Sequence, residues 1–561
     1  MKPLHILSCT LLCAAIFFSC RSKNKKTHTD DALNTSIKVD TVIYPLITDS
    51  ITIENFLAKH PVYYFHRNEI FTFYKNRNYA YAWFNNTGMV EQAGNFMNLL
   101  IHFDDEGLRD SIMYVAENNS LYQKISNPDY YYQGADENTL HFDLALTSNF
   151  FVYAQKVWGG MSEKQTKDLN WYISRKTIPY VSILDSILTG KRASFTAYEP
   201  VYAQYNLLKK YLKKYKALAK ENTTWEILAL PKDVNFFKEG DSSEIIAQFK
   251  ERLFILGDMQ QKDSSAYFDE TTAEAVKNFQ IRYGLAADST AGKNFFDAIN
   301  TSPEMLVRQI EINMERCRWV PYDLKGDYIT VNIPEFKMHI YDDDTLAWDM
   351  SVIVGKSSTS TTIFNDYLEY IIFSPYWEIT PNIIANEIVP AQKKNSSYLS
   401  KNNMEVTNGK GQVIDASSID WNAYSGSDFP YSVRQRPGAG NSLGWVKFIF
   451  PNSYSIYFHD TPTKNLFSSA QRSFSHGCIR LSEPKRFAEY LLRDDSTWTT
   501  AKIESVMYKG KPTQVNLKEK IPVFIAYFTA WVDKSGNINF RKDIYKHDEK
   551  LEETLYTTTD I

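Results

Sequence analysis

The hydrophobic pattern of the chain changes its period once, close to residue 320, and this change limits the folds open to the protein. Between residues 51 and 228, apolar side chains recur at helical spacing, most clearly at 92–101, 142–157 and 201–218. One more helix is predicted at residues 303–319. Beyond it, apolar and polar residues alternate as in strands at 328–333, 338–341, 350–355, 367–373, 445–450 and 454–459. The pattern predicts a multidomain α+β protein with an all-α N-terminal scaffold and a β-rich C-terminal region.

Length and composition exclude several classes of protein. The chain has 561 residues, more than the roughly 150–250 that one hydrophobic core usually serves, so we expect roughly three or four domains. Its 62 basic and 66 acidic residues give a net charge of −4, which provides no basic field for a nucleic-acid partner. With 43% hydrophobic and 23% charged residues, whole-chain disorder is excluded.

The first 20 residues are typical of an export signal. Lys2 precedes an apolar run at residues 6–18, which is too short to span a membrane comfortably. The segment ends in a Ser-Cys pair that resembles a bacterial lipobox, although Phe17 stands where that pattern prefers Leu. The resemblance implies lipidation of Cys20, followed by a flexible tether at residues 21–50. A plain signal peptide with an unmodified Cys20 is the alternative.

The two cysteines beyond the signal, Cys317 and Cys478, cannot form a disulfide framework. A solitary cysteine inside a His-Gly-Cys run of an exported chain indicates a catalytic thiol at Cys478. A disulfide between these two cysteines is the alternative that the sequence leaves open.

A separate pattern begins at residue 241 and predicts three short helices. Gly257 ends the first of them, and Asp269 is a predicted N-cap of the second. The order of residues through 241–292 resembles the small peptidoglycan-binding domain, with departures at residues 265–267 and at Ser289. We therefore expect a peptidoglycan-binding-like domain at residues 241–300. A helical spacer that no longer binds a ligand is the alternative.

Two short motifs in the β-rich region carry the candidate chemistry. In a strand at residues 454–459, Tyr457 and His459 share one face, so a strand anchored by its other face presents both to a cleft. An ordinary thiol is only a few per cent thiolate at neutral pH, and a neighbouring imidazole such as that of His459 raises this fraction for Cys478.

The residues around Cys478 complement this pair. Gly477 lets the backbone approach a substrate closely, and the amides of His476, Gly477 and Cys478 are candidate oxyanion donors. Arg480 supplies a cation for a substrate carboxylate or for the thiolate. We expect His476 to position the loop, with a direct contact to substrate as the alternative.

His459 followed by Ser475-His476-Gly477-Cys478-Ile479-Arg480 resembles the signature of the L,D-transpeptidase family, which has a YkuD-type catalytic domain. Further segments resemble its large multidomain subfamily, at residues 332–334, 375–377, 418–421, 434–438 and 459–462. The resemblance implies a catalytic domain at residues 327–497. The polar, broken stretch at residues 382–441, with a helical piece near residues 384–394, is then a candidate lid insertion. Residues 498–561 are expected to pack on this domain and to add a strand near residues 523–532, with a loose end from Lys546.

The resemblance also implies roles for single residues. Cys478 would be the nucleophile, His459 the general base and then acid, and the backbone carbonyl of Asp460 would orient the imidazole. The candidate substrate contacts are Arg480, Ser475, Tyr457 and Trp445. The two aromatic residues among them are equally expected as packing residues.

The function implied by the resemblance is that of a cysteine-dependent acyltransferase of cell-wall biogenesis and cell shape, which forms peptide cross-links in peptidoglycan. Cys478 would attack the tetrapeptide donor before its terminal D-Ala and pass the acyl group to an amine acceptor, without a cofactor. The resemblance further implies acylation by carbapenems, and the protein would lie in the periplasm, anchored to a membrane through Cys20. The alternatives are an L,D-carboxypeptidase, in which water replaces the amine, and a non-catalytic wall-binding lipoprotein.

Two other kinds of site fit the motifs less well. His459, Asp460, His476 and Cys478 have poor spacing for zinc, so we expect no metal among them. A papain-like hydrolase has its cysteine well before its histidine, whereas His459 precedes Cys478 here.

Overall fold

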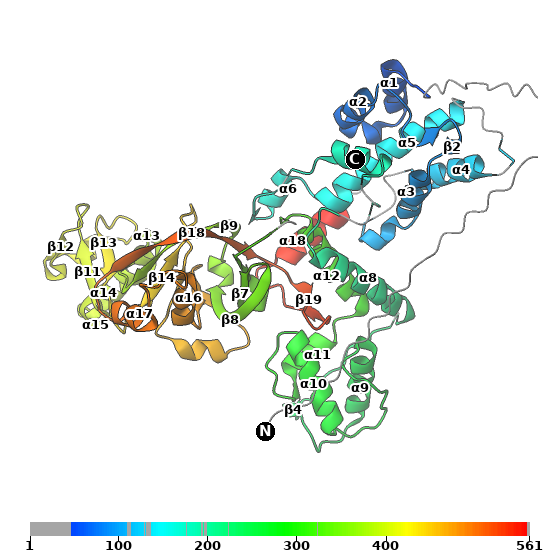
Figure 1. Ribbon diagram of the computed structural model, residues 1–561. Helices are drawn as coiled ribbons and strands as arrows, with labels where there is room; N and C mark the ends of the chain where they lie inside the picture. The colour runs from blue at the N-terminus through cyan, green and yellow to red at the C-terminus, as the bar shows by residue number, and fades with distance from the viewer. Residues whose placement is uncertain are drawn as a thin grey trace, which may run out of the picture. The chain divides into compact units, whose positions relative to one another are not determined.

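The computed structural model describes residues 46–108, 114–127, 129–130, 136–175, 177–191, 194–195, 199–222, 224–321 and 324–557 (Figure 1). The predicted signal peptide, Cys20 and most of the predicted tether lie outside these residues. Contacts group residues 45–561 into one compact unit. Within the described part of the chain, no helix is long and apolar enough to cross a membrane.

The N-terminal region is built around one helix, α5 (Glu137–Tyr153), which is buried along most of its length and continues as a π-helix, η4 (Ala154–Gly159). Asp136 caps its start by accepting a hydrogen bond from the Thr139 amide at 2.8 Å. The surrounding helices are α1 (Ser50–Lys59), η1 (Pro61–His66), α2 (Arg67–Asn76), α3 (Glu91–Ile101), η2 (Phe103–Glu106), α4 (Val115–Ser126), α6 (Glu163–Asp168), α7 (Tyr180–Leu188) and α8 (Gln204–Glu221). The helices predicted at residues 92–101, 142–157 and 201–218 are confirmed.

The prediction that this region is all-α is wrong in two places. A hairpin joins β1 (Phe84–Asn85) to β2 (Gly88–Met89), and β3 (Trp171–Tyr172) pairs in parallel with β9 (Ile363–Phe373) of the C-terminal sheet. Strands of two residues are too short to show an alternating pattern, and the partner of β3 is far away in the sequence.

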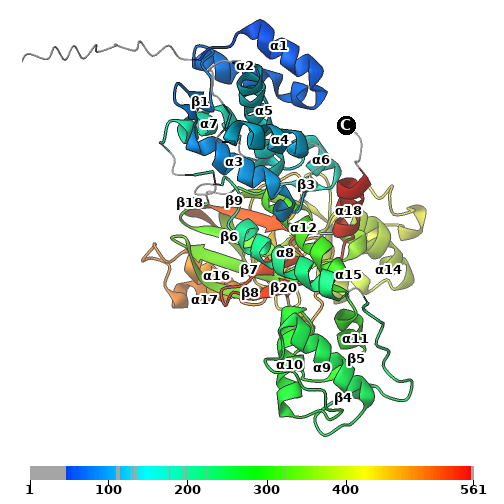
Figure 2. The same ribbon diagram turned by 90° about the vertical axis from the view of Figure 1, so that its right-hand side faces the viewer.

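Residues 236–299 form a small three-helix unit with a two-stranded sheet (Figure 2). Its elements are β4 (Phe236–Phe237), α9 (Glu244–Leu256), α10 (Glu270–Arg282), β5 (Ala291–Gly292) and α11 (Lys293–Ile299). Gly257 ends α9 with a φ of 88°, a conformation that suits glycine. Asp269 caps α10 by accepting a hydrogen bond from the Thr272 amide at 2.8 Å. Both predicted helix boundaries are confirmed.

A buried network joins the end of α12 (Pro303–Cys317) to the N-terminal helices. Arg318 pairs with Glu315 at 2.6 Å, and both side chains are almost completely buried. The same guanidinium donates to the Val157 and Glu106 carbonyls and to the Tyr205 hydroxyl. A buried ion pair needs such further hydrogen bonds to balance the loss of hydration.

We expect the substitution Arg318→Met to lower the free energy of unfolding by about 3–5 kcal/mol, because it leaves the Glu315 carboxylate buried and unpaired. Urea denaturation followed by circular dichroism measures this difference. The matched control is Arg308→Met, which removes an exposed guanidinium that pairs with Glu304 and Glu552 and is expected to change stability by less than about 1 kcal/mol. Equal effects of the two substitutions would contradict the importance of the network.

The C-terminal region contains a sheet whose strands close on themselves. The strand order is β14-β15-β17-β8-β7-β6-β18-β9, and β14 also pairs with β9, so the eight strands form a ring. The strands are β6 (Tyr328–Asn332), β7 (Lys337–Asp342), β8 (Thr345–Gly355), β9, β14 (Val446–Ile449), β15 (Phe458–His459), β17 (Ile479–Leu481) and β18 (Thr513–Ala526), with β16 (Ser473–Ser475) paired to β8. The strand predictions are confirmed, except at residues 454–459.

The strand predicted at residues 454–459 begins only at Phe458. Asn452 organises a turn before it: its amide group donates to the Phe450 and Ile456 carbonyls, and its oxygen accepts from the Ile456 amide. Ser455 in this turn has a φ of 58°, outside the extended region. Side-chain hydrogen bonding thus replaces strand pairing where the residue pattern alone indicated a strand.

The insertion at residues 382–441 is a small folded unit, and the helical piece predicted near residues 384–394 is confirmed. It contains α13 (Pro381–Ile383), a π-helix η7 (Ile384–Ile388), α14 (Val389–Lys394), α15 (Tyr398–Lys401), η8 (Ala416–Ser418) and η9 (Trp421–Ala423). Its strands β11 (Met404–Thr407), β12 (Val413–Ile414) and β13 (Ser432–Gln435) form a separate sheet with β10 (Trp377–Glu378), in the order β10-β13-β11-β12 (Figure 1). Its own hydrophobic core consists of Ile379, Ile383, Ile384, Ile388, Val389, Leu399, Val406, Trp421 and Val433.

The C-terminal residues are ordered further than the sequence suggested. After α16 (Pro484–Leu491) and α17 (Thr500–Met507), β18 fills the place between β6 and β9, and β19 (Ala530–Val532) pairs with β20 (Ile538–Phe540). The end predicted to be loose from Lys546 forms α18 (His547–Thr557), in which Leu551 is buried. Asp548 accepts a hydrogen bond from Thr529 and pairs with Arg316. These partners lie too far away in the sequence for the local pattern to reveal them.

Candidate active site

Strand register brings the predicted site residues to one face of the sheet. Lys447 on β14 is opposite His459 on β15, which in turn is opposite Arg480 on β17. Residues in register share a face, so these three side chains are neighbours. Tyr457 and Cys478 lie just before β15 and β17 and come to the same side, since Lys447 lies near the Tyr457 ring and the charges of Lys447 and Arg480 act on Cys478. The other face carries Phe448, Phe458 and Ile479, all completely buried, which anchor the strands in the core.

His459 is held as a neutral imidazole. Its Nδ1 lies 2.5 Å from the backbone oxygen of Asp460, and the ring is almost completely buried. Burial, together with the nearby charges of Arg480 and Lys447, lowers the pKa of His459 to about 3, although the hydrogen bond to Asp460 acts in the opposite direction. With Nδ1 donating to the carbonyl, Nε2 keeps its lone pair as a proton acceptor.

The Asp460 side chain fixes the turn that carries this carbonyl. Its carboxylate accepts hydrogen bonds from the amides of Trp445 and Thr461 and from the Lys464 ammonium group. Gly444 passes so close that a Cβ there would lie 2.3 Å from an Asp460 oxygen, and its φ of 61° also favours glycine. The backbone carbonyl of Asp460 therefore orients His459, and its side chain stabilises the turn that carries this carbonyl.

Cys478 is half-buried, and its thiol donates to the Ser455 carbonyl at 3.5 Å. Among the described residues, the hydrogen bonds of the sulfur involve Ser455 and Tyr457 but not His459. Burial raises the pKa of the Cys478 thiol, while hydrogen bonds from Tyr457 and the charges of Lys447 and Arg480 oppose this rise. At neutral pH the sulfur therefore carries its proton, and a base is needed to remove it.

The loop before Cys478 is built by Ser475 and Gly477. The Ser475 hydroxyl donates to the Cys478 carbonyl at 2.6 Å and accepts from the Gly477 amide at 3.1 Å. Gly477 has a φ of 118°, and its carbonyl accepts from the Thr361 hydroxyl at 2.8 Å. Ser475 is buried, and its hydroxyl stabilises the loop. The Gly477 amide donates to this hydroxyl.

The remaining predicted contacts have different surroundings. The Arg480 Nη1 donates to the Thr463 hydroxyl at 3.3 Å, whereas its buried Nε has no hydrogen-bond partner among the described residues. A buried donor without a partner is costly, so this group favours an incoming acceptor. The Tyr457 ring lies 5.8 Å from the His459 ring, and Trp445 packs edge-on against Tyr508.

Two residues near the site were not predicted from the sequence. The half-buried Lys447 contributes a charge beside both His459 and Cys478, and its ammonium group lies 5.6 Å from the Tyr457 ring centre. Glu387, on η7 of the insertion, accepts a hydrogen bond from the exposed His476 at 2.8 Å. Pairing the predicted strands in register would have revealed Lys447, whereas Glu387 has no signal in the sequence.

Cys317 differs from Cys478 in its surroundings. Both cysteines are free in the described structure, so the alternative of a disulfide between them is wrong. Cys317 is completely buried, and burial raises the pKa of its thiol well above the ordinary value. It is therefore a structural residue of α12.

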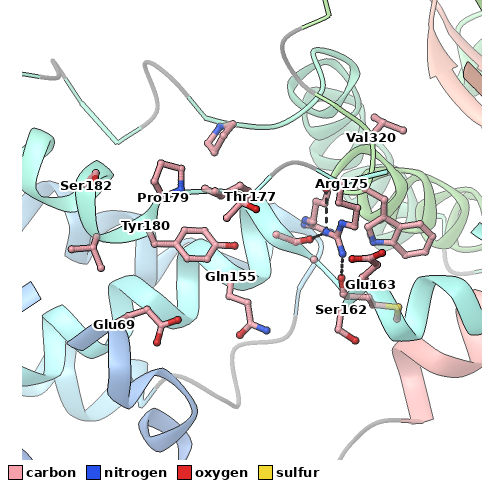
Figure 3. A pocket seen from close by; sticks show the side chains of 18 residues that line it. Glu69, Gln155, Ser162, Glu163, Arg175, Thr177, Pro179, Tyr180, Ser182 and Val320 are labelled. Atoms are coloured by element: carbon pink, nitrogen blue, oxygen red, sulfur yellow. Dashed lines mark hydrogen bonds between the residues drawn. The ribbon is translucent and has the colours of Figure 1, made fainter. Parts of the chain in front are cut away.

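A cavity of about 570 Å³ lies between residues of the N-terminal region and residues 318–320. Its lining includes none of the predicted site residues. Figure 3 shows Tyr180 and Gln155 along this cavity and Arg175 near one end. Arg175 donates to the carbonyls of Gly159 and Met161, so its charge is used to hold the chain. The cavity belongs to the N-terminal helices and to residues 318–320, not to the face that carries Cys478.

Three family models match the chain. The L,D-transpeptidase catalytic domain (YkuD) matches residues 326–515, a scaffold domain matches residues 68–212, and a "Putative peptidoglycan binding domain" matches residues 242–299. Among curated proteins, a "Putative L,D-transpeptidase" of Haemophilus influenzae is 35% identical over 254 residues, which cover 45% of this chain and 51% of that protein. The chain thus spans about half the length of this curated relative.

Two solved structures of L,D-transpeptidases are also similar to parts of the chain. That from Xylanimonas cellulosilytica is 13% identical, covers 53% of this chain and 100% of its own, and has a TM-score of 0.18. That from Stackebrandtia nassauensis is 14% identical, covers 53% of this chain and 97% of its own, and has a TM-score of 0.23. Such TM-scores are too low to support the fold, which rests on the family models. The face that carries Lys447, His459 and Cys478 lies within residues 326–515, and the chain carries an L,D-transpeptidase catalytic domain of the YkuD family together with a scaffold domain and a peptidoglycan-binding domain.

Proposed function

We propose that this protein is an L,D-transpeptidase that forms peptide cross-links in peptidoglycan through a thioester on Cys478. The observation that carries the proposal is the placement of Cys478, His459, Lys447 and Arg480 on one face of a sheet that matches the family's catalytic domain. The peptidoglycan-binding domain in the same chain supports the same substrate.

The reaction divides into two acyl transfers. His459 takes the proton from Cys478, the sulfur attacks the carbonyl before the terminal D-Ala of a tetrapeptide donor, and a tetrahedral oxyanion forms. Its collapse breaks the peptide bond, and His459 returns the proton to the leaving amine of D-Ala. The acceptor amine then loses a proton to His459 and attacks the thioester, which releases Cys478 and completes the cross-link.

The two half-buried cations, Arg480 and Lys447, are suited to hold the donor. The Arg480 Nε, which has no partner among the described residues, faces the same side as the thiol and would bind a carboxylate of the stem peptide. Lys447 adds a second positive charge beside the sulfur and would favour the thiolate as it forms. Arg480 would thus meet a negative charge when the substrate binds, and Lys447 would meet one when the thiolate forms.

A carboxypeptidase activity requires no other residue, because water would replace the acceptor amine at the thioester. The protein would act in the cell envelope, where its substrate lies, with Cys20 as the proposed lipid anchor to a membrane. His476 would position the catalytic loop through Glu387 of the insertion.

Incubation with purified muropeptides that carry tetrapeptide stems tests the proposal. We expect mass spectrometry to detect a cross-linked dimer that has lost one D-Ala per bond formed. A tripeptide monomer as the sole product would assign the chain to the carboxypeptidases. Unchanged tetrapeptides, with the protein folded and Cys478 reduced, would contradict the proposed function.

A further inference from the structure

A second group of chemically competent side chains lies in the scaffold domain. His60 directly follows α1, Glu117 lies in the first turn of α4, and His141 lies on α5. One ligand atom from each, an imidazole nitrogen or a carboxylate oxygen, lies within 4.8 Å of both others. The His141 Nε2 is 3.7 Å from a Glu117 oxygen. Three separate helices thus converge on one point with two nitrogen donors and one oxygen donor.

The hydrogen bond of His60 suits its ring to bind a metal ion. The His60 Nδ1 lies 2.9 Å from the Phe56 carbonyl, and a hydrogen bond donated there leaves Nε2 with its lone pair. A backbone acceptor on the second ring nitrogen is the usual support of a metal-binding histidine.

Aromatic rings hold the two histidines in place while the carboxylate stays accessible. Phe56 stacks on His60 with ring centres 4.3 Å apart and meets His141 edge-on at 5.4 Å. Tyr114 lies edge-on to His60 at 5.6 Å. The Glu117 side chain is about half exposed, so an ion can enter from solvent without unfolding the domain.

We propose that His60, Glu117 and His141 bind one Zn²⁺, with water as the fourth ligand, and that the ion ties α1, α4 and α5 together. Two imidazoles and one carboxylate suit Zn²⁺, whereas Mg²⁺ and Ca²⁺ prefer sites made of oxygen alone. Bonds of about 2 Å in a tetrahedron place ligand atoms roughly 3.3 Å apart, so the widest pair would move closer by about 1.5 Å on binding. The exposed Glu117 supplies that freedom.

The experiment measures zinc binding by the purified full chain carrying Cys478→Ala, which removes the accessible thiol as a competing ligand. After treatment with a chelator and addition of Zn²⁺, we expect one ion per chain after gel filtration, and a higher unfolding temperature with Zn²⁺ than without. In the same background, His60→Ala and His141→Ala are each expected to weaken binding by more than about 100-fold and to abolish the thermal shift.

His102→Ala is the matched control. His102 also follows a helix, α3, and its Nδ1 also contacts the carbonyl four residues earlier, at 2.8 Å, but it is not part of the ligand cluster. Its replacement should leave zinc binding unchanged. If the histidine variants do not fold, Glu117→Gln decides the question, because this exposed substitution should weaken binding at least about tenfold. Unchanged binding in Glu117→Gln, or no stoichiometric zinc in the parent protein, would overturn the proposal.

Discussion

The Cys478→Ala variant is expected to lose all covalent reaction with a carbapenem, whereas the parent protein gains one molecule per chain. The sulfur of Cys478 attacks the strained β-lactam carbonyl, the ring C–N bond breaks, and the proton passes to the ring nitrogen, so the adduct has the mass of the intact antibiotic. Intact-mass spectrometry measures the adduct. Because acylation needs a nucleophile and a site for the oxyanion, the result tests more than the reactivity of a thiol.

Cys317→Ala is the control for this experiment and should react like the parent, because Cys317 is completely buried. An adduct that maps to Cys317 would contradict the assignment. If the parent itself does not react, Glu387→Ala separates two explanations, since it breaks the contact between the insertion and His476. Acylation recovered in that variant would show that the insertion blocks the site, and no recovery would reject Cys478 as the nucleophile.

The second large effect is expected for His459→Gln, which should slow acylation by about 10²–10⁴-fold at pH 7 because the base is lost. The pKa of His459 is lowered to about 3, so its imidazole stays unprotonated above that value. The parent rate should therefore not fall through an apparent pKa near 6.5 when the pH decreases from 7 to 5. In the variant, the rate should follow the thiolate and rise about tenfold per pH unit below the raised pKa of Cys478.

A pH profile of carbapenem acylation from pH 5 to pH 9 distinguishes these cases. His476→Gln is the control, since this exposed histidine pairs with Glu387 and should lower the rate by less than about tenfold. A parent profile that declines near pH 6.5 would contradict a neutral, buried His459. A His459→Gln deficit that stays constant across the range would contradict its role as the base.

The helices could be predicted because their signal is local. Apolar side chains at helical spacing and caps such as Gly257 and Asp269 act within a few residues, and the structure forms its helices there. Elements that depend on distant partners were missed or misjudged. The pair of residues in β3 is a strand only because β9 offers an edge, and α18 is ordered because Asp548 meets Thr529 and Arg316.

For a related reason, the sequence indicated the helical piece of the insertion near residues 384–394 but not its sheet or its core. Its core residues, among them Ile388, Val406 and Val433, are scattered among lysines, asparagines and glycines. No short segment of the insertion therefore shows a clear hydrophobic period, although these residues pack into one core in the structure. Within the site, the motif pointed to His459 and Cys478, and their catalytic roles stay predictions. Lys447 became visible only when strand register placed it beside them. Register depends on pairing between separate strands, which the order of residues in one strand does not contain.

The position of β18 also determines when the catalytic sheet can be completed. β18 lies between β6 and β9, so β6 and β9 do not hydrogen-bond to each other and are joined only through β18. β18 ends at Ala526. Synthesis runs from the N-terminus, and a growing chain therefore contains Cys478 before it contains the strand that closes the sheet. A chain cut off before residue 513 would keep the whole signature motif and two open strand edges, which favour aggregation. Cys478, the proposed nucleophile, thus becomes part of a finished sheet only after the residues of β18 have been made.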